Sequence, residues 1–90
     1  MISPQQVETM IQTKFPDAEV QVAGDGEHFE AIIVSDEFAG KTKVKQHQMV
    51  YAAVQEAMTS EAIHALSLKT YTPQTYQLTV GAKGHSPVQQ

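Results

Sequence analysis

The 90-residue sequence contains no cysteine and no arginine. Without cysteine the chain can form no disulfide, offer no thiolate, and hold no zinc ion or iron-sulfur cluster through sulfur of its own. Any metal chemistry must therefore use imidazole or carboxylate groups, or borrow ligands from another molecule. Six lysines against ten aspartate and glutamate residues leave a net charge of -4. This charge argues against a general polyanion binder, because nonspecific affinity for nucleic acids comes mostly from cations that neutralise phosphate.

Long apolar runs are also missing. No stretch approaches the roughly 18 to 20 apolar residues of a membrane-spanning helix, and the first ten residues, MISPQQVETM, lack a basic region followed by an apolar one. We therefore expect a cytoplasmic protein without membrane association. Hydrophobic residues make up 41% of the chain, which is enough for one modest core. Residues 1–78 are expected to form a single domain, and residues 79–90 a flexible polar tail.

Capping and turn residues predict the first half of the domain. A helix is expected over residues 4–14, because Ser3 supplies a capping hydroxyl and Pro16 disfavours helical geometry in the residue before it. Alternating apolar residues on both sides of a Gly-Asp-Gly turn at 24–26 predict a hairpin over residues 19–34.

A second helix is predicted from residue 41 or 42 to 58, because apolar residues recur there at helical spacing. The expected buried stripe contains Val44, Val50, Tyr51, Val54, Ala57 and Met58, with His47 between them, whereas Lys45, Gln48, Met49, Ala52 and Glu56 are expected on the opposite side. In the loop before this helix, Phe38 is expected to be buried, and Gly40 to supply a backbone geometry that other residues resist. The apolar segment that starts near His64 predicts a strand covered on both faces, and a short helix is expected to follow it and end near Leu78.

This order predicts an α+β sandwich, an αββααβ arrangement with a three-stranded mixed sheet and helices on one face. A helical connection between the second and third strands favours a parallel, adjacent pair with a right-handed crossover. His28 and His64, each at the start of its strand, would then lie at the same edge of the sheet. Neighbouring strands are about 4.8 Å apart, so the two imidazoles could share a ligand or a metal ion.

The lysines at the start of the second helix have two interpretations. Lys41, Lys43 and Lys45 oppose the helix dipole there, so they are either three solvated side chains or a docking surface for an anionic partner. Met49 is a further candidate for a partner contact, and His47 is expected to be hydrogen-bonded and partly buried rather than a metal ligand. The sequence contains no catalytic constellation, and we do not expect an enzyme.

Several segments resemble the BolA family. They are Phe38-x-Gly40-Lys41, Lys45-x-His47-x-x-Val50-Tyr51, Ile63-His64-Ala65-Leu66-Ser67-Leu68-Lys69-Thr70 and Thr72-Pro73. The hairpin segment Gly24-Asp25-Gly26-x-His28-Phe29 resembles more closely the bacterial branch called IbaG or YrbA. The resemblance extends over roughly residues 4–78.

This resemblance implies a fold similar to class II KH domains and a partnership with a monothiol glutaredoxin. The two proteins would share a [2Fe-2S] cluster, in iron-sulfur cluster assembly or in iron and stress regulation. It further implies that His64 and, in the variable hairpin loop, His28 are the ligands from this chain. A glutaredoxin cysteine and a glutathione thiol would bind the other iron, a division similar to that in Rieske centres.

The sequence departs from the family beside the helix histidine. Many relatives carry arginines there, whereas Gln46 and Gln48 flank His47 here, which weakens the case for nucleic-acid contact at this point. The alternative function is that of a KH-like transcription regulator that binds DNA through Lys41–Lys45 and the helix face. We expect such binding to be weak, and a homodimer of the protein without cluster is left open.

Overall fold

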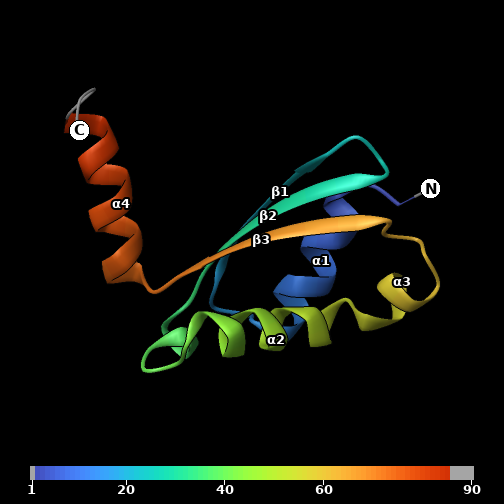
Figure 1. Ribbon diagram of the computed structural model, residues 1–90, viewed down its shortest axis with the longest axis horizontal. Coiled ribbons are helices and arrows are strands. Elements are labelled where there is room, and N and C mark those ends of the chain that lie inside the picture. Colours follow the sequence, from blue (N-terminus) through green and yellow to red (C-terminus); the bar gives the residue numbers. More distant parts are fainter. Residues whose placement is uncertain (1, 86–90) are drawn as a thin grey trace.

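The computed structural model describes residues 2–85, with side chains to residue 79, as one three-stranded sheet and its surrounding helices. The elements in chain order are α1 (Pro4–Lys14), β1 (Glu19–Gly24), β2 (His28–Val34), a 3-10 turn η1 (Asp36–Phe38), α2 (Lys43–Ala53), α3 (Gln55–Thr59), β3 (Ala65–Tyr71) and α4 (Pro73–His85). Helices α1, α2 and α3 cover one face of the sheet, whereas α4 extends away from the sandwich beyond the end of β3 (Figure 1). The predicted α+β class with a mixed three-stranded sheet is confirmed. No helix within the described residues is long and apolar enough to cross a membrane.

The strand order is β1-β2-β3, with β1 antiparallel and β3 parallel to β2. The parallel register pairs His28 with Ala65 at one end and Val34 with Tyr71 at the other. Helices α2 and α3 form the connection between the two parallel strands, because a chain that leaves the end of β2 must return to the start of β3. The predicted parallel, adjacent pairing is therefore confirmed.

Local signals determine α1 as predicted. The Ser3 hydroxyl accepts a hydrogen bond from the backbone N–H of Gln6 (3.2 Å), and the Gln6 side chain accepts one from the backbone N–H of Ser3 (2.8 Å). The helix ends at Lys14, with Phe15 as the capping residue. This reciprocal cap satisfies two N–H groups that have no partner inside the helix.

The core lies between the sheet and the helices. Its side chains with no more than 1% exposure are Val7, Ile11, Phe15, Ala31, Ile33, Phe38, Val50, Val54 and Ile63. Each large apolar side chain buried in this way contributes about 1.5–3 kcal/mol. The rings of Phe15 and Phe38 lie 5.6 Å apart, so the loop before α2 is anchored in the core as expected. Gly40 has a φ of 77°, which confirms that the loop needs a left-handed residue there.

The predicted buried stripe of the second helix is confirmed for Val50, Val54 and Ala57, which are buried, and for Met58, which packs against the core. It is wrong for the other two positions. The helix is interrupted at Val54, which separates α2 from α3, and Val44 and Tyr51 are 68% and 37% exposed. Gln46 is buried in their place, and Met49 packs against the core although it was expected on the outer side. The apolar pattern missed Gln46 because a glutamine whose amide is hydrogen-bonded can occupy a core position.

Two predictions about the last third of the chain are also wrong. Strand β3 is not covered on both faces, because the helices lie on one face only and Ser67 and Lys69 are exposed on the other. The last helix does not end near Leu78 but continues to His85, so the first part of the predicted tail is helical. Glycine disfavours a helix by only about 1 kcal/mol, and it therefore does not have to end one. Residues 86–90 of the predicted tail lie outside the described residues.

Candidate metal centre

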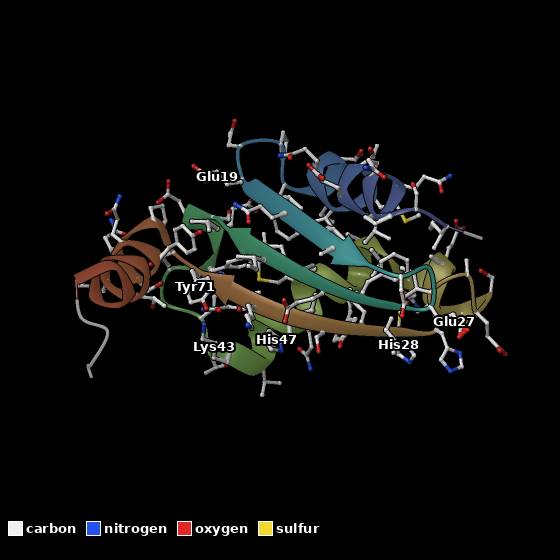
Figure 2. The ribbon with its side chains drawn as sticks, turned by 90° about the horizontal axis from the view of Figure 1, so that it is seen from above. Glu19, Glu27, His28, Lys43, His47 and Tyr71 are labelled. Carbon is white, nitrogen blue, oxygen red and sulfur yellow. The ribbon has the colours of Figure 1, made fainter. Side chains whose placement is uncertain are left out.

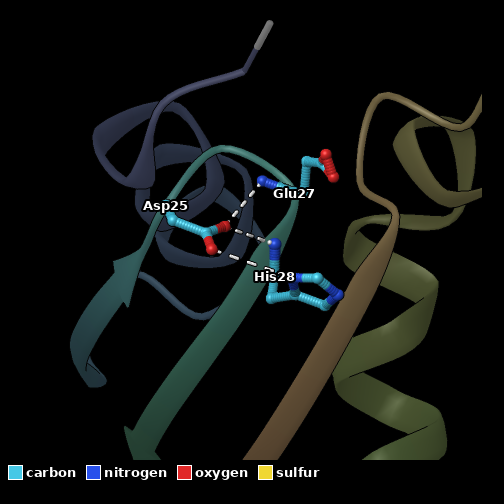
Figure 3. Close-up of polar contacts among 3 residues, drawn as sticks. All are labelled: Asp25, Glu27 and His28. Atoms are coloured by element: carbon cyan, nitrogen blue, oxygen red, sulfur yellow. Dashed lines mark hydrogen bonds and ion pairs between the residues drawn. The ribbon is translucent and has the colours of Figure 1, made fainter.

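The turn between β1 and β2 is held by the carboxylate of Asp25. Its Oδ1 atom accepts hydrogen bonds from the backbone N–H groups of Glu27 (2.9 Å) and His28 (2.8 Å), as Figure 3 shows. The backbone N–H of Asp25 donates to the carbonyl of His28 (3.2 Å) and closes the turn. At Gly24 an added Cβ would lie 2.5 Å from Cδ1 of Phe29 and 2.6 Å from the His28 carbonyl oxygen. These constraints fix the point at which His28 leaves the turn.

The same carboxylate also faces the imidazole of His28. Its second oxygen, Oδ2, lies 3.7 Å from Nδ1 of His28, and the two side chains are 65% (His28) and 70% (Asp25) exposed. The hydrogen bond from the backbone N–H of His28, followed by that from Glu27, lowers the pKa of the Asp25 carboxyl below its ordinary value of 3.8. Asp25 therefore remains a negatively charged neighbour of the His28 ring at neutral pH.

His28 and His64 meet at the end of the sheet where β2 and β3 begin. The backbone N–H of Ala65 donates to the carbonyl of Glu27 (3.0 Å), which ties the hairpin turn to the start of β3. The two imidazole rings are 5.9 Å apart between centroids and nearly perpendicular, at 88°. Both residues are exposed. The structure thus confirms that these histidines, distant in the sequence, lie at the same edge.

The spacing of the rings can be compared with what one metal ion requires. Two imidazoles bound at about 2.0–2.1 Å with tetrahedral angles place their ring centroids about 5 Å apart. The observed 5.9 Å is close to this separation, and both residues are exposed. Among the described residues, no group of three or more histidine, aspartate or glutamate side chains is positioned to hold a metal ion. The pair fits two of the ligands of one metal ion, and the remaining ligands must come from elsewhere.

Lys43 and Tyr51 lie along the outer edge of β3 rather than at the histidine pair. The ammonium group of Lys43 donates a hydrogen bond to the carbonyl of Thr70 and lies 4.9 Å from the ring centroid of Tyr71. The Tyr51 hydroxyl, two turns along α2, donates to the carbonyl of Leu66 (3.3 Å). Two α2 side chains therefore bind backbone carbonyls of β3.

His47 lies one helical turn after Lys43 and is half-buried, as predicted. Within the described part of the chain, however, no hydrogen bond to its ring is found, so the predicted hydrogen bond is not observed. Figure 2 shows Lys43 and Tyr71 toward one end of the sheet and His28 at the other. Strand β3 spans about 3.3 Å per residue, so Thr70 lies on the order of 20 Å from His64. Lys43 is therefore not part of the histidine site.

Lys45 and Met49 lie on another side of α2. They line a cavity of about 350 Å³ together with Lys14, the last residue of α1, and Phe15, which caps that helix. Lys41 precedes α2 and is exposed in the loop. The five predicted contact residues therefore do not form one surface. Lys43 and His47, one turn apart, lie on the side of α2 toward the edge of β3. Lys45 and Met49 lie on the side toward the end of α1, and Lys41 precedes the helix.

Two functional or structural roles were not predicted from the sequence. Asp25 was interpreted only as a turn residue, although an aspartate three residues before a candidate ligand histidine is a recognisable signal. Gln46 was interpreted only as a missing arginine. Its amide N–H group donates to the carbonyls of Phe38 (3.1 Å) and Lys41 (2.9 Å), and its oxygen accepts from the Thr70 hydroxyl (2.7 Å). No local pattern contains this network, because its members come from three separate segments.

Comparison with known proteins gives the same family from sequence and from structure. The family model described as BolA-like protein matches residues 2–75. The Escherichia coli K12 protein named acid stress protein IbaG is 38% identical over 68 residues, which cover 76% of this chain and 81% of that protein. The E. coli K12 protein named DNA-binding transcriptional regulator BolA is 42% identical over 50 residues, which cover 56% of this chain and 47% of that protein. A solved structure of a bolA protein homologue from Coxiella burnetii has a TM-score of 0.77 and 41% identity, and covers 86% of this chain and 99% of that one.

Proposed function

The chain belongs to the BolA family, and we propose that it is an accessory protein that binds a monothiol glutaredoxin and shares a [2Fe-2S] cluster with it. Its role would lie in iron-sulfur cluster assembly or trafficking, or in iron and stress regulation. The observation that carries the proposal is the histidine pair, whose rings are 5.9 Å apart and exposed at the end of the sheet. Relatives in this family are named as stress proteins or regulators rather than enzymes.

The donor set of this chain suits one half of such a cluster. A protein without cysteine can offer two neutral imidazoles, from His64 and His28, while the partner's cysteine and glutathione supply thiolates. Two imidazoles in place of two thiolates raise the reduction potential of a [2Fe-2S] cluster. Within this chain, the hairpin turn and the backbone bond between Ala65 and Glu27 tie the segment that carries His28 to the start of the strand that follows His64.

The proposal is tested by replacing each histidine in the reconstituted mixed complex. His64→Ala should leave the domain folded, because the side chain is exposed, yet should change the visible spectrum and shorten the cluster lifetime about tenfold or more. His28→Ala should have the same effect more mildly, since a ligand on a turn is more easily replaced by water. The measurement is visible absorbance and circular dichroism of the complex with a monothiol glutaredoxin and glutathione.

Ser67→Ala is the matched control, because Ser67 is an exposed residue on the same strand and offers no metal ligand. Its spectrum and lifetime should equal those of the unmodified protein. If His64→Ala gives a spectrum and lifetime indistinguishable from this control, the histidine pair is not a cluster site.

DNA binding is the second candidate function, favoured by the exposed lysines at the start of α2 and by the name of one relative. The net charge of -4 and the engagement of Lys43 with Thr70 argue that the affinity is low at physiological salt. Retention of labelled DNA should fall steeply as salt rises. Submicromolar, sequence-selective binding at about 150 mM salt would instead make regulation the main function.

A further inference from the structure

The two oxygens of the Asp25 carboxylate have different neighbours. Both backbone hydrogen bonds of the hairpin turn go to Oδ1, whereas Oδ2 accepts neither of them and faces Nδ1 of His28 at 3.7 Å. A turn needs only one such acceptor, and the second oxygen is therefore available to the imidazole. The carboxylate of the neighbouring Glu27 points away from this ring (Figure 3). Asp25 is thus the acidic side chain directed at His28.

We propose that Asp25 is a positioning residue for His28. Its Oδ2 accepts a hydrogen bond from Nδ1–H, which holds the ring in the Nδ1–H tautomer and turns the lone pair of Nε2 toward His64. Histidines that bind metals almost always donate their other ring N–H to a carboxylate, a carbonyl or water, and this contact fixes both tautomer and orientation. The assignment of Nε2 as the ligand atom rests on the proposed function, whereas the tautomer is a property of the protein alone.

The observed distance is compatible with this role. A hydrogen bond from an imidazole N–H to a carboxylate has a length of about 2.7–3.2 Å, so the 3.7 Å contact must shorten by about 0.5–1 Å. The backbone on both sides of the contact is fixed, because Oδ1 binds the N–H groups of Glu27 and His28. A small rotation of the exposed imidazole closes the gap without moving the turn.

The tautomer can be measured in the protein without cluster, by ring ¹⁵N NMR at about pH 8, above the ordinary histidine pKa of about 6.5. His28 of the unmodified protein should be mainly in the Nδ1–H form, although an unconstrained imidazole prefers the Nε2–H form. Asp25→Asn keeps an Oδ1 acceptor for the turn and replaces Oδ2 by an N–H donor, so His28 should shift toward the Nε2–H form. Unchanged backbone amide shifts of Glu27 and His28 would show that the turn is retained.

Glu27→Gln is the matched control, because it removes one negative charge beside His28 without touching the ring. The tautomer of His28 should not change in this variant. If Asp25→Asn leaves the same tautomer populations as the unmodified protein, as Glu27→Gln should, Asp25 does not position His28 and the inference is wrong.

The mixed complex with glutaredoxin tests the link to metal binding. Asp25→Asn should shorten the cluster lifetime about tenfold, as other losses of a partner beside a metal ligand do, and Glu27→Gln should not. A changed tautomer with an unchanged lifetime, in a complex that His28→Ala does destabilise, would overturn the idea that positioning serves ligation. If neither His28→Ala nor His64→Ala affects the lifetime, the proposed function fails while the tautomer result stands.

Discussion

Gln46 offers a quantitative test of how the second helix is attached to the sheet. Replacement by leucine removes three hydrogen bonds and leaves the Thr70 hydroxyl in buried surroundings without a partner, whereas the Phe38 carbonyl keeps its bond from the backbone N–H of Lys41. The unpaired hydroxyl costs about 1–3 kcal/mol and each of the other lost hydrogen bonds about 0.5–1.5 kcal/mol, and the added apolar contact of leucine offsets part of this loss. Water can replace the bond to the carbonyl of Lys41, which is only partly buried. We expect Gln46→Leu to lower the free energy of unfolding by about 2–4 kcal/mol.

The assay is equilibrium unfolding in urea, followed by far-UV circular dichroism. In a domain of this size a loss of 1 kcal/mol lowers Tm by about 4–8 °C, so thermal unfolding should report a decrease of about 10 °C or more. Gln48→Leu is the matched control, since Gln48 lies on the same helix and is exposed. It should change stability by less than about 0.5 kcal/mol.

A double-mutant cycle isolates the buried pair. Thr70→Val keeps the shape of the side chain and removes the hydroxyl that donates to Gln46. The sum of the two single losses should exceed the loss measured for the double variant by about 1–2 kcal/mol, because contacting residues in one network couple. If Gln46→Leu is no less stable than Gln48→Leu, the buried network does not hold α2 on the sheet.

Two further predictions concern the hairpin turn. Gly24→Ala should lower stability by about 1–3 kcal/mol and move His28 away from His64, because the new Cβ meets the His28 carbonyl and Phe29. Ring-to-ring nuclear Overhauser effects between the two histidines measure this shift. Gly40→Ala is strained only through the φ of 77° at that position, and it should not cause the shift. Since the pKa of Asp25 is lowered in the folded protein, its contribution to stability is present above the ordinary value of 3.8 and lost as pH falls through the folded value. Asp25→Asn should therefore flatten the acid limb of the stability curve, measured by urea unfolding, whereas an Asp17→Asn protein with the same limb as Asp25→Asn would contradict the assignment.

Local chemistry in the sequence determined the elements and much of the topology. The start of α1 was predictable because its cap, Ser3 and Gln6, lies within four residues, and the hairpin because its turn is a Gly-Asp-Gly segment. The parallel pairing of β2 and β3 followed from the helical connection between them. The proximity of His28 and His64 followed in turn, since each begins its strand.

Contacts between distant segments decided what the sequence could not. The burial of Gln46 in α2 depends on its partners Phe38, Lys41 and Thr70 in other segments, so apolar spacing alone could not reveal it. Apolar spacing also placed Val44 and Tyr51 in the core, although both are exposed. The single covered face of β3 depends on which side of the sheet the helices occupy. Apolar periodicity detects side chains that pack on an apolar surface, but it does not detect a polar side chain that is buried because its hydrogen bonds are satisfied.

The histidine site divides in the same way. The meeting of His28 and His64 was determined by the sequence, because each lies at the start of its strand and the helical connection makes the two strands parallel neighbours. The orientation of the rings, the second oxygen of Asp25 facing His28, and the distance of Lys43 from the pair were decided only by the tertiary structure. The physical reason is that side-chain orientation depends on neighbours a few ångströms away in space, and those neighbours lie in segments that no local pattern connects.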